Sequence, residues 1–87
     1  MVNIVIDSAQ DSPKHFCLDA QGLNCPEPVM LLHKKIREMG TGDTLEVWTT
    51  DPSTQRDIPK FCSFLGHTLL EQTEKPDRYF FLLRKGT

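Results

Sequence analysis

Cys25 stands where the chain is about to enter a helix, in the stretch LDAQGLNCPEPV. Pro26 and Pro28 follow it and bracket Glu27. Proline suits the first helical turn, because the N–H groups there have no intrahelical partner. With Cys25 as N-cap, the prolines take the first and third helical positions. The rival is Asn24 as N-cap with Glu27 closing a capping box, which would put Pro28 where an N–H is needed. The prolines favour Cys25 as the cap.

A thiol at this position could do nucleophilic chemistry. The positive end of the helix dipole favours a thiolate, and the charge of Glu27 opposes it, so we expect moderate activation. A moderately activated sulfur suits a group that must both accept and release sulfur. Cysteine is a poor N-cap compared with Ser, Asp or Asn, so capping alone does not explain its presence. We expect an exposed Cys25 sulfur near the Glu27 amide.

The sequence offers little support for other thiol chemistry. Position 28 is proline, so Cys25 lacks the resolving partner of a CxxC motif. No histidine is placed as an obvious base, and a chain this small leaves little room for a substrate pocket. Three cysteines and three histidines show no zinc-site spacing, so no metal is expected. We expect Cys62 to be buried and inert, and we favour core filling over persulfide resolution for Cys17.

Two segments show helical periodicity and four read as strands. Apolar residues from Val29 to Met39 recur at helical spacing, with His33 at the edge of that face. Asp51 and Pro52 suit the N-cap and first position of a second helix, in which Pro59 should cause a kink or a split. The strands are expected at residues 15–20, 43–50, 67–74 and 78–85.

The order strand–helix–strand–helix–strand–strand predicts the fold. Helical crossovers join parallel neighbouring strands, and repeated crossovers of one hand lie on one face of the sheet. We therefore predict an α/β two-layer sandwich of βαβαββ order, with two helices on one face of a four-stranded mixed sheet. Residues 1–14 read as a tail that could be disordered or lie along a sheet edge, and residues 15–87 as one domain.

The composition restricts the functional classes. With 87 residues, 38% hydrophobic and 25% charged, the chain suits one small globular domain. A net charge of −2 argues against direct binding of nucleic acid. No run of about 18 apolar residues and no export signal are found, so we expect a cytoplasmic protein without membrane association.

Three stretches together resemble the TusA/SirA-like sulfur carriers: LDAQGLNCPEPVM, TTDPSTQRDIPKFC and RYFFLLRKG. The resemblance runs from about His15 to Gly86 and rests on a CPxP motif followed by a DPxxxxDIPxFC segment. It implies the βαβαββ sandwich and a sulfur-accepting Cys25. This cysteine would take a persulfide from a pyridoxal-phosphate cysteine desulfurase and pass its outer sulfur to a downstream acceptor protein. The carrier itself would need no cofactor.

The resemblance also implies a pathway and supporting residues. In the family the relay leads to 2-thiolation of the wobble uridine of tRNA, while relatives serve molybdenum-cofactor assembly or sulfur oxidation; a non-catalytic regulatory domain is the alternative from another class. The residues that would shape the site are Asp19, Gly22, Pro26, Glu27 and Pro28.

Other residues are expected to meet a partner. Asp51, Arg56 and Asp57 match the family's second motif, and its helix should begin near the first helix. For His33 we prefer partner contact to metal binding. Lys34, Lys35 and Arg37 could form a docking patch for acidic surfaces, although such a charge run is more often a solvated face.

Overall fold

The computed structural model describes residues 14–86, and its element order is the predicted one. The expectation for the tail falls, apart from Lys14, outside these residues. The elements are β1 (His15–Ala20), α2 (Glu27–Glu38), β2 (Thr44–Thr49), α3 (Thr54–Leu65), β3 (Thr68–Glu74) and β4 (Tyr79–Arg84).

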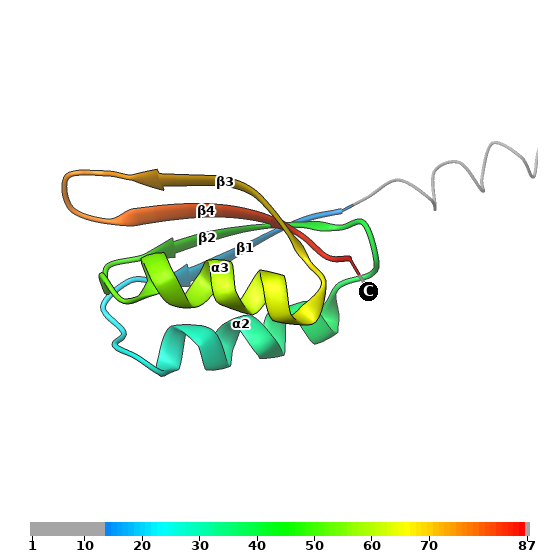
Figure 1. Cartoon of the computed structure of the whole chain (residues 1–87), viewed down its shortest axis with the longest axis horizontal. Coiled ribbons are helices and arrows are strands. Elements are labelled where there is room, and N and C mark those ends of the chain that lie inside the picture. Colours follow the sequence, from blue (N-terminus) through cyan, green and yellow to red (C-terminus); the bar gives the residue numbers. More distant parts are fainter. Residues whose placement is uncertain (1–13, 87) are drawn as a thin grey trace, which may run out of the picture.

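The four strands form one mixed sheet in the order β1-β2-β4-β3. β1 and β2, which α2 connects, are parallel, whereas β4 pairs antiparallel with both β2 and β3. Both helices lie on the same face of this sheet (Figure 1). The predicted two-layer α/β sandwich is confirmed.

The core lies between the helices and the sheet. Side chains alternate along β2 and β4, so every second one points inward, as a sheet covered on one face requires. Each helix contributes one apolar stripe to the same layer. The largest fully buried apolar side chains are Phe81, Leu32, Leu45, Ile58, Leu83, Val47 and Pro28.

The start of α3 differs from the prediction. Its N-cap is Ser53 rather than Asp51, and Pro52 lies in the preceding turn. The reason is a tight turn in which the Thr54 N–H donates to the Asp51 carbonyl oxygen at 3.0 Å. The Thr54 hydroxyl bonds the same carbonyl oxygen and the buried Thr49 hydroxyl, so this turn is fastened to the end of β2.

Pro59 lies inside α3 without splitting it. A proline cannot donate to the carbonyl four residues earlier, which here is that of Gln55. The Gln72 Nε2 donates to this Gln55 oxygen instead, at 3.1 Å. A side chain of β3 therefore replaces the missing helical bond, and the expected split is wrong.

The two cysteines outside the CPxP motif, Cys17 and Cys62, have different environments. Cys62 is 2% exposed in the core, and burial raises the pKa of its thiol to about 11, so the expected inert thiol is confirmed. Cys17 is exposed, and the interpretation as core filler is wrong. It alternates with the inward-facing Phe16 and Leu18 and therefore points to the face of the sheet without helices.

Neither helix of residues 14–86 is long and apolar enough to cross a membrane.

Candidate functional site

The candidate site lies at the carboxyl ends of two parallel strands. Cys25 is in the loop that follows β1, and Asp51 is in the loop that follows β2. Because β1 and β2 are parallel neighbours, these loops meet at one edge of the sheet, where both helices begin (Figure 1). Such edges commonly hold functional groups in open α/β sheets.

The β1–α2 loop is held by local hydrogen bonds. Gly22 adopts a φ of 84°, a left-handed conformation that glycine takes without strain, and its N–H donates to the Thr50 hydroxyl at 2.8 Å. Asp19 accepts the Gln21 N–H at 3.0 Å. These bonds fix the conformation of the loop, and the prediction that Asp19 and Gly22 shape the site stays a prediction.

The start of α2 lies one residue later than predicted. Pro26, not Cys25, is the N-cap, and the first helical hydrogen bond runs from the Met30 N–H to the Pro26 carbonyl. The Glu27 N–H donates to the Asn24 carbonyl at 2.9 Å, so it does not meet the sulfur as expected. Pro28 is at the second helical position, where no intrahelical donor is required, and is buried.

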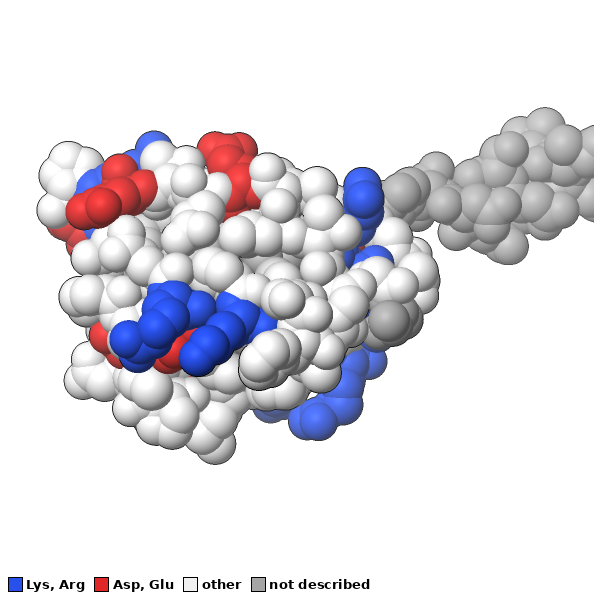
Figure 2. All heavy atoms as spheres, in the orientation of Figure 1, with Lys and Arg blue, Asp and Glu red and all other residues white. Residues whose placement is uncertain are grey.

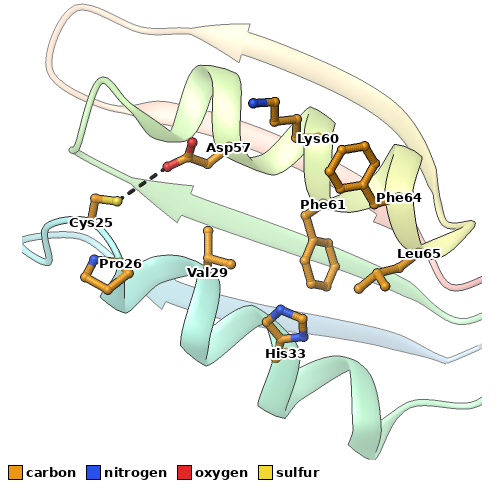
Figure 3. A pocket seen from close by; sticks show the side chains of 9 residues that line it. All are labelled: Cys25, Pro26, Val29, His33, Asp57, Lys60, Phe61, Phe64 and Leu65. Carbon is orange, nitrogen blue, oxygen red and sulfur yellow. Dashed lines mark hydrogen bonds between the residues drawn. The ribbon is translucent and has the colours of Figure 1, made fainter.

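The Cys25 sulfur is exposed, as predicted, but it faces the other helix. Its S–H donates to Asp57 Oδ2 in the first turn of α3, with 3.6 Å between sulfur and oxygen (Figure 3). Arg56 Nε lies 3.5 Å from the other Asp57 oxygen. The sulfur is therefore paired with a hydrogen-bond acceptor, and this bond requires a protonated thiol.

Asp51 joins the two loops. Its Oδ2 accepts the Cys25 N–H at 2.7 Å, and the same carboxylate accepts the N–H and hydroxyl of Ser53. These bonds lower its pKa, most strongly the Ser53 N–H, then the Ser53 hydroxyl and the Cys25 N–H. Asp51 was predicted to contact a partner. In the structure its carboxylate binds the Cys25 N–H and so links the loop after β2 to the loop after β1.

The lowered pKa of Asp51 predicts acid sensitivity. The pKa of Asp43 is also lowered, by the N–H groups of Lys14 and Gly40. A carboxylate whose pKa falls on folding stabilises the protein above its ordinary value of 3.8, and this stability is lost as the pH falls below that value. The urea concentration at the midpoint of unfolding should therefore not change with pH near neutrality, and it should fall once the pH is below about 4. Asp51→Asn should lower the midpoint at pH 7 and flatten the acid drop, whereas Asp77→Asn, in the exposed β3–β4 turn, should leave the profile unchanged.

A groove of ≈ 380 Å³ extends from the Cys25 sulfur between α2 and α3. The expectation of no pocket is wrong, because side chains from two helices leave a gap that neither segment predicts alone. His33 of α2 lines the groove, edge-to-face with Phe61 of α3 at 4.7 Å between ring centroids (Figure 3). The residues that line the groove are Cys25, Pro26, Val29, His33, Asp57, Lys60, Phe61, Phe64 and Leu65.

The predicted partner residues divide into two groups. His33 and Asp57 line the groove, and Arg56 contacts Asp57. Lys34 lines a separate hollow with Lys35, while Arg37 is exposed and lines neither. Basic side chains also gather over α3 on a largely uncharged face (Figure 2). The basic residues of α3 are Arg56 and Lys60.

Sequence reasoning missed Lys60 and Phe64 as groove residues. Phe64 is 79% exposed, which is unusual for a large aromatic side chain. It lies off the apolar stripe that places Phe61 and Cys62 in the core. An aromatic residue outside the buried face was the signal that could have identified it.

Known proteins resemble this chain over most of its length. Residues 17–85 match the family model described as "Sulfurtransferase TusA". The chain is 59% identical over 73 residues to the "Sulfur carrier protein TusA" of Pseudomonas paraeruginosa, covering 84% of this chain and 92% of that one. It is 63% identical over 68 residues to the protein of that name from Pseudomonas entomophila, covering 78% and 85%.

A solved structure shares the fold. The SirA-like protein of Desulfitobacterium hafniense superposes with a TM-score of 0.73 at 24% identity, covering 83% of this chain and 99% of that one. At 24% identity this similarity shows a shared fold and nothing about function.

Proposed function

This chain belongs to the TusA family of sulfurtransferases and is a sulfur carrier, and from that premise we propose that Cys25 is the residue that carries the sulfur. The single observation that carries the proposal is the exposed Cys25 sulfur at the end of an apolar groove between two helices. Cys62 is buried, and Cys17 points away from the helices. Among residues 14–86, Cys25 is thus the thiol that combines access with a surface for a partner.

The proposed reaction is a transfer of sulfane sulfur. The Cys25 sulfur attacks the outer sulfur of a protein persulfide on a pyridoxal-phosphate cysteine desulfurase. A sulfur–sulfur bond forms at Cys25 and the donor's sulfur–sulfur bond breaks. The donor cysteine leaves as a thiolate and takes up the proton that the Cys25 thiol loses. The products are Cys25 persulfide and a donor thiol, so no oxidant, reductant or carrier-bound cofactor is required.

Unloading repeats the same exchange. The thiol of a downstream acceptor protein attacks the outer sulfur of Cys25 persulfide, and Cys25 leaves as a thiol once it regains a proton. Both exchanges need direct contact between two proteins, because the outer sulfur passes directly from one cysteine to the next. The groove beside Cys25 suits this contact, since exposed aromatic and apolar side chains favour partner binding.

The relay can be tested with purified components. The carrier is incubated with a cysteine desulfurase and L-cysteine, and its intact mass is then measured without reductant. The proposal expects the mass of one added sulfur atom, removable by dithiothreitol. A carrier whose mass stays unchanged beside an active desulfurase would contradict it.

For the final product we propose 2-thiolation of the wobble uridine of tRNA, in the cytoplasm and without direct tRNA or membrane binding by the carrier. A bacterial strain that lacks its own TusA should regain thiolated tRNA when this chain is expressed, and Cys25→Ser should not restore it. Mass spectrometry of nucleosides from total tRNA measures the result. Sulfur loading without restored thiolation would instead favour molybdenum-cofactor assembly or sulfur oxidation. Full rescue by Cys25→Ser would favour a regulatory domain.

A further inference from the structure

We propose that the outer edge of β1 is a docking surface for a second copy of this chain, whose own β1 pairs with it antiparallel so that the two sheets join. β1 lies at one edge of the sheet and β3 at the other (Figure 1). Within residues 14–86, no strand pairs with the outer side of β1. The inference concerns the assembly of the carrier and does not depend on which residue carries sulfur.

The two edges of the sheet differ in how they are protected from pairing. Proteins commonly block an edge strand with lysine, proline or a β-bulge. β3 has such a device, because its register with β4 shifts between Leu69 and Glu71. β1 contains neither lysine nor proline, and its register with β2 is regular over all six residues from His15 to Ala20. The edge of β1 is therefore a straight template that a further strand can extend.

The sequence of β1 complements itself about Cys17. In an antiparallel pair, residues directly opposite each other point to the same face of the sheet, so a symmetric pair must be centred on one residue. A centre on Cys17 places Phe16 opposite Leu18 on the helix side. It places His15 opposite Asp19 on the open side, where imidazole and carboxylate can hydrogen-bond. A centre on Leu18 would oppose Cys17 to Asp19 instead, so we infer the register centred on Cys17.

The helix layer has room for a second copy. Neighbouring strands lie about 4.8 Å apart and packed helices about 8–10 Å apart, so one helix covers about two strands. The side of α2 that borders β1 lines a hollow with Leu18 and carries both signs of charge, from Lys34, Lys35 and Glu38. It therefore presents no field of a single sign to its own copy, and two α2 helices can lie side by side over the joined sheet.

The arrangement keeps both sulfur sites accessible. Cys25 lies beyond the carboxyl end of β1, and no residue of β1 lines its groove. Because the paired strands are antiparallel, their carboxyl ends point in opposite directions. The dimer thus presents two Cys25 sites at opposite ends of the joined sheet, each open to its own partner protein.

Sedimentation equilibrium of the full chain in reductant tests the pairing. The average mass should rise from one chain toward two with concentration, and stop there, because a symmetric pair uses up both edges. Cys17→Lys puts two like charges opposite each other and should raise the Kd about five-fold or more, with unchanged thermal unfolding. Leu70→Lys puts the same charge on β3 and should leave the Kd unchanged. A mass that stays at one chain up to about 1 mM would mean that the edge is free or covered by the chain's own residues. That result, a mass beyond two chains, or an unchanged Kd in Cys17→Lys would overturn the proposal.

Oxidative cross-linking tests the register. In a Cys25→Ser background the remaining exposed thiol of residues 14–86 is Cys17. Opposite Cα atoms of an antiparallel pair lie about 4.5–5.5 Å apart, within the range that a disulfide spans. Diamide should oxidise two Cys17 thiols to one disulfide, taking up their protons and electrons as it becomes a hydrazine. The collision control carries Leu70→Cys together with Cys17→Ser and Cys25→Ser. We expect the Cys17 dimer to form about ten-fold faster or more, because the dimer holds its thiols together. Equal rates would contradict the register centred on Cys17.

Discussion

Cys25→Ser is expected to gain no sulfur from a cysteine desulfurase, whereas the wild-type chain gains one atom under the same conditions. Serine is close to cysteine in size and keeps the backbone N–H that donates to Asp51, so the fold should persist. The hydroxyl cannot hold sulfane sulfur, so the loss should be complete rather than partial. Intact mass after incubation with L-cysteine measures the loaded fraction, and thermal unfolding checks the fold.

Cys17→Ser is the matched control for this loss. It removes the other exposed thiol, from the face of the sheet without helices. We expect it to load like the wild-type chain. Sulfur on Cys25→Ser at the wild-type level would contradict the assignment, and loss of loading in Cys17→Ser would show that the open face of the sheet takes part.

Phe64→Ala is expected to reduce loading by the desulfurase about ten-fold or more at low carrier concentration, as for a buried aromatic anchor at an interface. Phe64 lies at the end of the groove away from Cys25 (Figure 3), and its side chain is 79% exposed in the free carrier. Its truncation should therefore cost little folding stability. The defect should appear as a higher KM with a similar maximal rate, because Phe64 lies too far along the groove to act on the sulfur.

Leu70→Ala provides a comparison on β3. Leu70 is 43% exposed and does not line the groove, so its truncation should leave the KM unchanged. Iodoacetamide should alkylate Cys25 in Phe64→Ala at the wild-type rate, since this reagent needs no docking. Wild-type loading kinetics in Phe64→Ala would show that the partner binds elsewhere.

The sequence was sufficient for the architecture because each element has a periodic pattern of its own. The strand expected at residues 15–20 is β1, and the helical periodicity from Val29 to Met39 corresponds to the stripe of α2 that buries Leu32 and Ile36. The helix starts were less predictable. Pro26 and Pro28 are compatible with several positions in a first turn, and hydrogen bonds from the surrounding loop decided among them.

The partner of the sulfur could not be predicted from local sequence. Glu27 is the acidic neighbour of Cys25 in the chain, yet the carboxylate that meets the sulfur belongs to Asp57 on the other helix. That contact depends on the parallel pairing of β1 with β2, which brings the starts of both helices together. The groove has the same origin, since Val29 of α2 and Phe64 of α3 line it together only because the two helices pack side by side.

The bond between the Cys25 N–H and Asp51 spans 26 residues, and that between the thiol and Asp57 spans 32. During synthesis Cys25 leaves the ribosome well before either carboxylate. A nascent or truncated chain that stops before Asp51 therefore carries the cysteine of the CPxP motif without the oxygen atoms that hold it. The hydrogen bonds that hold Cys25 can therefore form only after the chain has been extended past Asp57.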